Sequence, residues 1–218
     1  MLSSMPPSPA SLSLAPELPL KFVGGDPSLD LVNTVDWTSA GLEHDRLVDY
    51  ARLVEWAGSS GVMSRPAVAR LLAIARDRPG ASRSAYQHAR WARWVLQRLL
   101  TSVAATHPSA DALEDFNRLL RHAGQHLRLV YTRRGRGGVE WRPVRADDLD
   151  AVLWLVARSA AKLLEFDAPR LRVCAGPDCG WVYVDRSRNG LRRWCEMQTC
   201  GTLSKSRRRA ARLARAGT

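Results

Sequence analysis

Hydrophobic residues recur at helical spacing through most of the chain between residues 26 and 165. Positions three and four residues apart carry Leu, Val, Ile, Ala and Trp, which is typical of helices that bury one face against a core. The pattern predicts helices that begin at Asp26 and then cover residues 45–57, 64–77, 82–105, 109–125 and 147–165. This part of the chain should therefore be a helical domain.

Local signals mark several helix ends. Asp26 and Ser109 have side chains that accept hydrogen bonds from the first amides of a helix, and Pro27 suits a first helical turn. Pro79-Gly80 should break the helix over residues 64–77.

Short strands are predicted beside these helices. Two apolar runs, residues 127–132 and 139–144, flank a loop rich in Arg and Gly and predict a β-hairpin. Residues 21–23 predict another short strand. Residues 1–19 consist largely of Ser, Pro, Ala and Leu without a periodic face, and we expect them to be a disordered arm.

All four cysteines lie in one C-terminal segment of 27 residues. Four residues separate Cys174 from Cys179, four separate Cys195 from Cys200, and fifteen separate the two pairs. Two pairs with equal internal spacing suit a tetrahedral zinc site, because each pair supplies two thiolates and the intervening segment folds back toward the same ion. Four protein ligands would fill the coordination sphere, so one structural Zn²⁺ is expected.

Other interpretations of the four cysteines remain open at this point. Two disulfides would need an oxidising compartment, and nothing in the sequence marks secretion. Buried free thiols would not need matched spacing. An iron–sulfur cluster also uses four cysteines. Zinc is the interpretation that the spacing favours.

The expected secondary structure around the cysteines is a loop, a hairpin and a helix. Residues 181–184 alternate like a strand, Asn189-Gly190 is a tight-turn signal, and a second strand should end at Trp194-Cys195. A helix should follow from Glu196 to Arg215. This order predicts a treble-clef-like finger.

The segment over residues 174–209, CAGPDCGWVYVDRSRNGLRRWCEMQTCGTLSKSRRR, resembles the CGNR zinc-finger family of bacterial proteins. The matching positions are the four cysteines, Pro177, Asp178, Gly180, Trp181, residues 185–189, Arg193, Trp194 and Gly201. The family takes its name from Cys-Gly-Asn-Arg after the last ligand, whereas this chain has Thr202-Leu203 after Cys200-Gly201.

Residues 29–37, LDLVNTVDW, resemble the opening motif of the ABATE domain that CGNR proteins usually carry at the N-terminus. The resemblance spans about residues 20–212 and implies a transcription regulator. The expected fold is mainly α (α+β), with an arm over residues 1–19, a helical domain over 20–168, and a zinc finger with a basic C-terminal helix over 169–218.

Positive charge is concentrated around the cysteines. The whole chain has a formal net charge of +12, and residues 170–218 contain twelve Lys and Arg residues against three Asp and Glu residues. Such a balance is expected of a module that binds a polyanion, although a solvated and solubilising face is the alternative. The candidate nucleic-acid contacts are Arg186, Arg188, Arg192, Arg193, Lys205, Arg207, Arg208, Arg209, Arg212 and Arg215.

The sequence contains no recognisable active site. It lacks a nucleophile-elbow motif, a phosphate-binding glycine loop and paired carboxylates with a matching base, so we expect no enzyme. His122 and His126 share one helix face, but no third metal ligand accompanies them. The chain has no run of 18 apolar residues and no basic leader, so a cytoplasmic protein with reduced thiols is expected.

Two functions of different class follow. One is a DNA-binding regulator whose helical domain senses a small-molecule effector or forms a homodimer. The other is a protein- or RNA-binding adaptor in which zinc only braces the C-terminus. Candidate positions for an effector pocket are Asn33, Trp91, Trp94 and the histidines.

Overall fold

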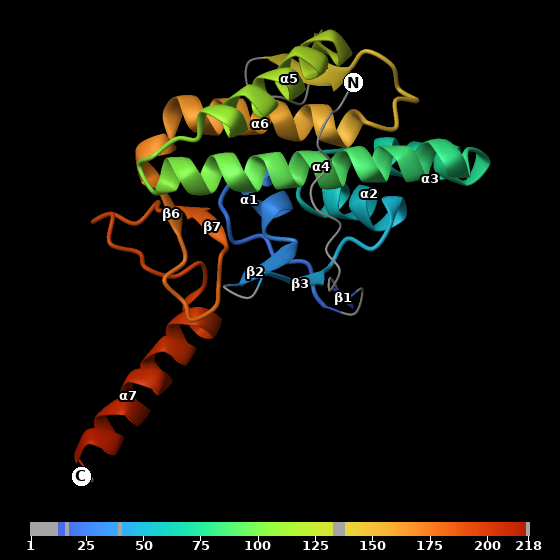
Figure 1. The fold of residues 1–218 in the computed structure, drawn as a ribbon. Coiled ribbons are helices and arrows are strands. Elements are labelled where there is room, and N and C mark those ends of the chain that lie inside the picture. The colour runs from blue at the N-terminus through green and yellow to red at the C-terminus, as the bar shows by residue number, and fades with distance from the viewer. Residues whose placement is uncertain (1–12, 16–17, 39–40, 133–137, 217–218) are drawn as a thin grey trace.

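The computed structural model describes residues 13–15, 18–38, 41–132 and 138–216, and it confirms the mainly helical fold. The helices of the N-terminal domain are α1 (Pro27–Val32), α2 (Tyr50–Ser59), α3 (Arg65–Asp77), α4 (Pro79–Ala104), α5 (Ala110–His126) and α6 (Ala151–Phe166). The long helix α4 crosses the centre of the domain, with α5 and α6 on one side and α1 and α2 on the other (Figure 1).

One continuous core joins these helices. Helix α4 contributes Leu96 and Leu100, α5 contributes Phe116, and α2 contributes Trp56, all of them at most 2% exposed. Each such side chain stabilises the fold by about 1.5–3 kcal/mol relative to an exposed position. The apolar stripes predicted from the sequence therefore face the interior.

The helix ends agree partly with the predictions. The Asp26 carboxylate accepts hydrogen bonds from the Ser28 amide (2.8 Å) and from the Ser159 hydroxyl, so it caps α1 and ties that helix to α6. The predicted break after residue 77 is confirmed, but the next helix begins earlier than the predicted residue 82. The chain breaks at Arg78, and Pro79 opens α4, because a proline lacks only an amide that the first turn leaves free.

The domain also contains a small three-stranded sheet that was not predicted from the sequence. Strands β1 (Ser13–Leu14), β2 (Val35–Thr38) and β3 (Gly41–Asp45) form it in the order β1-β3-β2, whereas residues 21–23 form no strand. The helix expected from residue 45 accordingly begins later, at Tyr50. Strand β1 belongs to the expected disordered arm and is ordered by parallel pairing with β3; residues 1–12 and 16–17 lie outside the described part.

The predicted hairpin is present as β4 (Leu127–Tyr131) and β5 (Val139–Pro143), paired antiparallel. Leu129 lies opposite Trp141, and Tyr131 lies opposite Val139. Because strand residues two positions apart share a face, these four side chains gather on one face of the hairpin. All four remain exposed, from 37% for Trp141 to 78% for Tyr131.

A buried ion pair fixes the sheet to α4. The Arg93 guanidinium donates to both carboxylate oxygens of Asp45, and it also donates to the Thr34 hydroxyl at 2.9 Å. The Arg93 and Asp45 side chains are at most 5% exposed. Removing one partner would leave an uncompensated buried charge, which costs about 3–5 kcal/mol in comparable pairs.

Asp30 on α1 is a second buried acid. Its carboxylate accepts the Gly24 amide at 2.8 Å, and the residue is 7% exposed. Burial raises the pKa of Asp30 to about 6. Folding therefore favours the protonated acid, and the stability that this contributes is lost as the pH rises through about 6.

We predict that Asp30→Asn gains stability over the native chain as the pH rises from about 4 to about 7, by at most about 3 kcal/mol. Asn cannot ionise, and its amide oxygen can still accept the Gly24 amide. Urea unfolding of both proteins across this pH range measures the difference, in which the titration of all other groups cancels. A difference that stays constant over this range would contradict the assignment.

Candidate metal centre and nucleic-acid interface

The zinc-finger part of the chain begins with a short antiparallel pair. Strands β6 (Leu171–Val173) and β7 (Val182–Val184) flank the loop that carries Cys174 and Cys179. The strand expected before Cys195 is absent, and that prediction was wrong. Asp185 instead accepts the amides of Ser187 and Arg192, so side-chain bonds shape this segment in place of a strand ladder.

The second pair of cysteines lies at the start of the C-terminal helix. Cys195 precedes a wide helical turn over Met197–Gly201, which contains Cys200, and α7 (Thr202–Ala216) continues from it. The positive end of the helix dipole favours thiolates there. The predicted helix after Cys195 is therefore confirmed, with a wide first turn.

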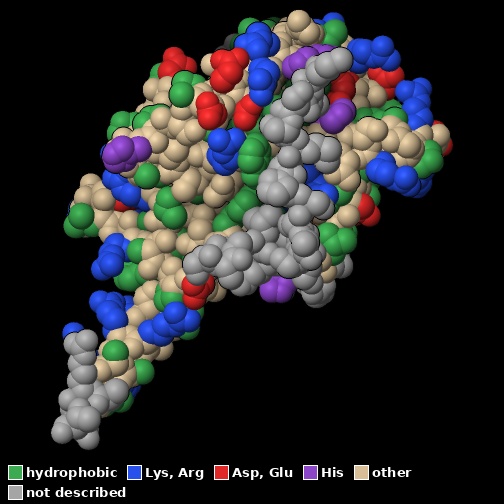
Figure 2. Space-filling view, viewed as in Figure 1, with side chains coloured by type: hydrophobic (Ala, Val, Ile, Leu, Met, Phe, Trp, Pro, Cys, Tyr) green, Lys and Arg blue, Asp and Glu red, His purple; other side chains and the backbone are tan. Residues whose placement is uncertain are grey.

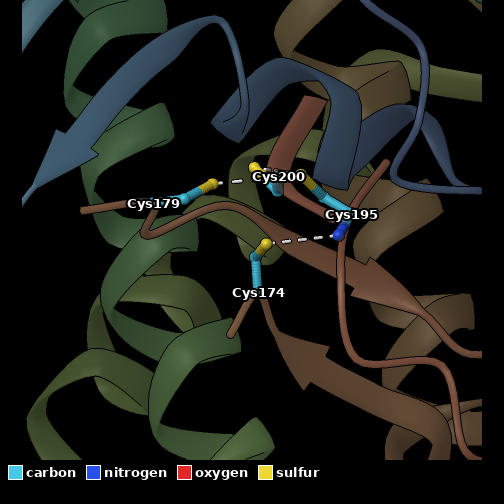
Figure 3. A group of neighbouring side chains, drawn as sticks. All are labelled: Cys174, Cys179, Cys195 and Cys200. Carbon is cyan, nitrogen blue, oxygen red and sulfur yellow. Dashed lines mark hydrogen bonds between the residues drawn. The ribbon is translucent and has the colours of Figure 1, made fainter. Parts of the chain in front are cut away.

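The four sulfur atoms converge on one point (Figure 3). All four lie within 4.8 Å of one another, with Cys179 Sγ 3.9 Å from Cys195 Sγ and Cys195 Sγ 3.7 Å from Cys200 Sγ. A regular tetrahedron with zinc–sulfur bonds of about 2.3 Å has edges of about 3.8 Å. The two shorter spacings match this edge, and the largest exceeds it by at most about 1 Å, so Zn²⁺ fits with small shifts of the side chains.

The surrounding backbone supports the same arrangement. The amides of Gly176 and Cys195 donate to Cys174 Sγ at 3.3 and 3.2 Å. A Cβ atom on Gly176 would lie 2.8 Å from the Cys200 Cβ, so the first loop needs glycine there to approach the second pair.

The thiols cannot all ionise without a cation. Hydrogen bonds from the Cys179 and Cys195 thiols, followed by those of the backbone amides, lower the pKa of Cys174 to about 2. The shared hydrogen bonds with Cys174 raise the pKa of Cys179 to about 12 and also raise that of Cys195. A bound Zn²⁺ supplies the charge that keeps thiolates together and cross-links the two halves of the finger.

The four cysteines are not joined as disulfides, and they are the one group in the described residues that could hold a metal ion. His122 and His126 do not form a metal pair. Both rings stack on Trp154, and His126 Nδ1 lies 3.0 Å from an oxygen of Asp148.

The finger is docked on the N-terminal domain by Asn33, which directly follows α1. The Asn33 amide nitrogen donates to the Val182 carbonyl at 2.9 Å, and its amide oxygen accepts the Val182 amide at 3.0 Å. Both residues are at most 1% exposed. The Asn33 side chain thus satisfies both backbone groups of one residue in β7.

Trp181 and Gly180 extend this contact. The Trp181 indole nitrogen donates to the Val35 carbonyl at 2.9 Å, and the guanidinium of Arg46 lies 5.2 Å from the Trp181 ring. The Gly180 amide donates to the Trp37 carbonyl at 2.6 Å. A Cβ on Gly180 would lie 2.5 Å from that carbonyl oxygen, so this approach also requires glycine.

The LDLVNTVDW motif therefore contacts the zinc finger directly. The sequence predicted Asn33 as a candidate position for an effector pocket but did not place it at this junction. The signal available was a polar Asn at the end of a largely apolar helix, because a short polar side chain in such a place can bond to backbone groups. Its partner, 149 residues away, is visible only in the structure.

The candidate nucleic-acid contacts fall into two groups. Helix α7 projects from the body of the protein, and Lys and Arg side chains follow it (Figures 1 and 2). Lys205, Arg207, Arg208, Arg209 and Arg212 are exposed there, while the Arg215 side chain lies outside the described part. Arg186, Arg188 and Arg193 are exposed on the loop between β7 and Cys195.

Arg192 differs from these residues, because its side chain is half-buried and has partners within the protein. Its guanidinium donates to the carbonyls of Trp194 and Cys195 and, at 3.3 Å, to that of Val23. It also lies 4.3 Å from the Tyr183 ring. Arg192 therefore holds the finger together, and two of its guanidinium nitrogens are used in doing so.

A mainly helical domain carrying a structural cysteine zinc site defines a two-part zinc-finger protein. The model of the ABATE family, described as "Putative stress-induced transcription regulator", matches residues 25–165, and the chain belongs to this family. The CGNR zinc-finger model matches residues 170–213. None of the curated proteins matches the chain. Within the described residues, no helix is long and apolar enough to cross a membrane.

We predict that Cys195→Ser abolishes zinc retention. Cys195 Sγ lies near the sulfurs of both Cys179 and Cys200, so three thiolates would leave the coordination sphere open. Elemental analysis of the purified protein should give about one zinc per chain for the native protein and well below that for the variant. Gln198→Ala, in the exposed turn between two ligands, is the matched control and should retain zinc. Full zinc occupancy in the variant would refute the four-ligand site.

We predict that Asn33→Ala lowers the free energy of unfolding by about 2–4 kcal/mol, because it leaves the buried amide and carbonyl of Val182 without partners. Denaturant unfolding measures this change. Asn117→Ala on α5 removes the same amide away from the junction and should change stability by less than about 0.5 kcal/mol. Equal effects of the two substitutions would show that Asn33 does not join the domains.

Proposed function

We propose that this protein is a zinc-dependent DNA-binding regulator. In this proposal the finger and α7 bind the duplex, and the helical domain senses a small molecule or mediates homodimer formation. No catalytic step is assigned to it, and we place it in the cytoplasm with its thiols reduced. The observation that carries the proposal is the exposed and almost unpaired positive charge of α7.

Helix α7 has the charge and accessibility that phosphate binding needs. It contains no Asp or Glu, and each of its five described basic side chains is exposed. Among those side chains one ion pair is found, between Arg207 and Asp178 at 3.8 Å. Cations without acidic partners can replace the counterions that surround DNA, which is the main source of non-specific affinity.

The loop after β7 offers a second basic surface. Arg188 and Arg193 are exposed, and Arg193 lies 5.6 Å from the Trp194 ring. Trp194 in turn donates to the Ser204 hydroxyl in α7 at 3.1 Å, so this loop is tied to the start of the helix. We propose that the loop and helix contact neighbouring phosphates of one duplex, and that exposed polar groups near Gln198 read base edges.

An adaptor that binds another protein is the second candidate function. The observation that favours it is the exposed apolar face of the β4–β5 hairpin, formed by Leu129, Tyr131, Val139 and Trp141. Exposed apolar patches commonly mark interaction sites. An adaptor would bind duplex DNA weakly and without sequence preference.

We predict that the double variant Arg208→Gln/Arg212→Gln weakens DNA binding. The slope of log affinity against log salt concentration should also fall by the amount expected for the loss of about two phosphate contacts. The measurement is the duplex affinity by fluorescence anisotropy over a series of salt concentrations, with duplexes first selected from a random pool by the zinc-loaded protein. Arg65→Gln/Arg70→Gln removes the same charge from exposed positions on α3 and is the control.

The result expected of a regulator is enrichment of one motif, with the salt slope reduced only by the α7 variant. No enriched motif, with binding lost as salt rises, would contradict the sequence-specific regulator and favour the adaptor. Equal loss of affinity in both variants would show that net charge, and not α7, accounts for binding.

A further inference from the structure

A cleft of about 630 Å³ lies between α2, α3 and the beginning of α4. Its lining residues all fall between residues 48 and 87, so none belongs to the zinc finger. Small-molecule sites commonly have volumes of about 300–1,000 Å³ and mostly apolar walls. The cleft is large enough for a compact organic molecule. The cleft is not at the effector pocket that the sequence predicted. None of the residues predicted for that pocket lines it, which were Asn33, Trp91, Trp94 and the histidines.

The walls of the cleft combine aliphatic and aromatic surface. Leu72 and Ala75 come from α3, Tyr50 from α2 and Tyr86 from α4. The hydroxyl of Tyr50 donates to the Leu149 carbonyl at 2.8 Å, and that of Tyr86 donates to the Leu47 carbonyl. Because both hydroxyls donate hydrogen bonds to backbone carbonyls, the two rings are held in place and a ligand can pack against them.

The acidic residues of the cleft already have partners. The Asp49 carboxylate accepts the Arg52 amide at 2.8 Å and caps α2. Glu55 pairs with the Arg52 guanidinium at 3.3 Å. These two acids are therefore occupied in holding α2.

The arginines of the cleft do not have partners. Arg76 on α3 and Arg83 on α4 both line it, and within the described residues neither forms an ion pair or a hydrogen bond. Two free guanidinium groups beside an apolar wall suit a carboxylate or a similar oxyanion attached to a hydrophobic body, because guanidinium binds such groups through two parallel hydrogen bonds.

We propose that this cleft binds a small organic carboxylate with an aromatic or aliphatic body. Arg76 and Arg83 hold the carboxylate, and Leu72, Ala75 and Tyr86 contact the body. The inference rests on the ligand-sensing part of the proposed function and names its site and the chemical class of its ligand.

The cleft is also connected to the junction with the finger. Val48, Asp49 and Tyr50 line the cleft and begin two residues after Arg46, whose guanidinium lies over Trp181. The Leu47 carbonyl between them accepts the Tyr86 hydroxyl. One short segment therefore contacts both the cleft wall and the finger.

Calorimetric titration of the zinc-loaded full chain with 1-naphthoate, beside the neutral isostere 1-naphthamide, tests the proposal. We expect the carboxylate to bind at least about tenfold more tightly than the amide, and Arg76→Gln or Arg83→Gln each to weaken carboxylate binding by about tenfold. Arg70→Gln, on α3 but outside the cleft, should leave the affinity unchanged.

Three results would overturn the proposal. These are no binding of 1-naphthoate to the native protein, equal affinity for the carboxylate and the amide, and unchanged carboxylate affinity in both cleft variants. The titration contains no DNA. A titration without binding would therefore leave the DNA-binding part of the proposed function standing. A failure to bind DNA would likewise not change the result of the titration.

Discussion

The paired hydrogen bonds between Asn33 and the backbone of Val182 are the contact on which the two-part architecture depends. They are buried, so water cannot replace them, and they satisfy both polar groups of a residue beside the zinc loop. The Trp181 indole and the Gly180 amide, from the two residues before Val182, both donate to backbone carbonyls of β2. The finger is therefore built into the surface of the helical domain and is not a separate module on a linker.

This junction determines where the basic helix points. Zinc joins the loop after β6 to the turn that begins α7, and the junction joins β7 to the body, so α7 leaves the protein in a fixed direction although it makes few contacts of its own (Figure 1). Arg192 and Lys21 add to this support, the latter through its ion pair with Glu196 at 2.6 Å. A helix held only at its base can present positive charge around its circumference.

Much of the fold and all four ligands could be predicted from sequence, because helical periodicity and cysteine spacing are local signals. The predictions that failed depend on distant partners. Asp45 looked like the start of a helix but pairs in β3 and is neutralised by Arg93 of α4. Arg192 looked like one more basic residue of a charged loop, yet three backbone carbonyls from the finger and residue 23 use its guanidinium. Arg93 lies 48 residues from Asp45, and Val23 lies 169 residues from Arg192, so these two partners are not evident from neighbouring residues.

The zinc site and the N-terminal motif LDLVNTVDW form one structural unit through these contacts. Hydrogen exchange of the backbone amides, with zinc bound and after chelation, measures this most directly. We expect that amides of residues 24–37 lose protection together with those of residues 174–184, while α5 and α6 stay protected. If residues 24–37 exchange at the same rate with and without zinc, the finger folds independently and the account is contradicted.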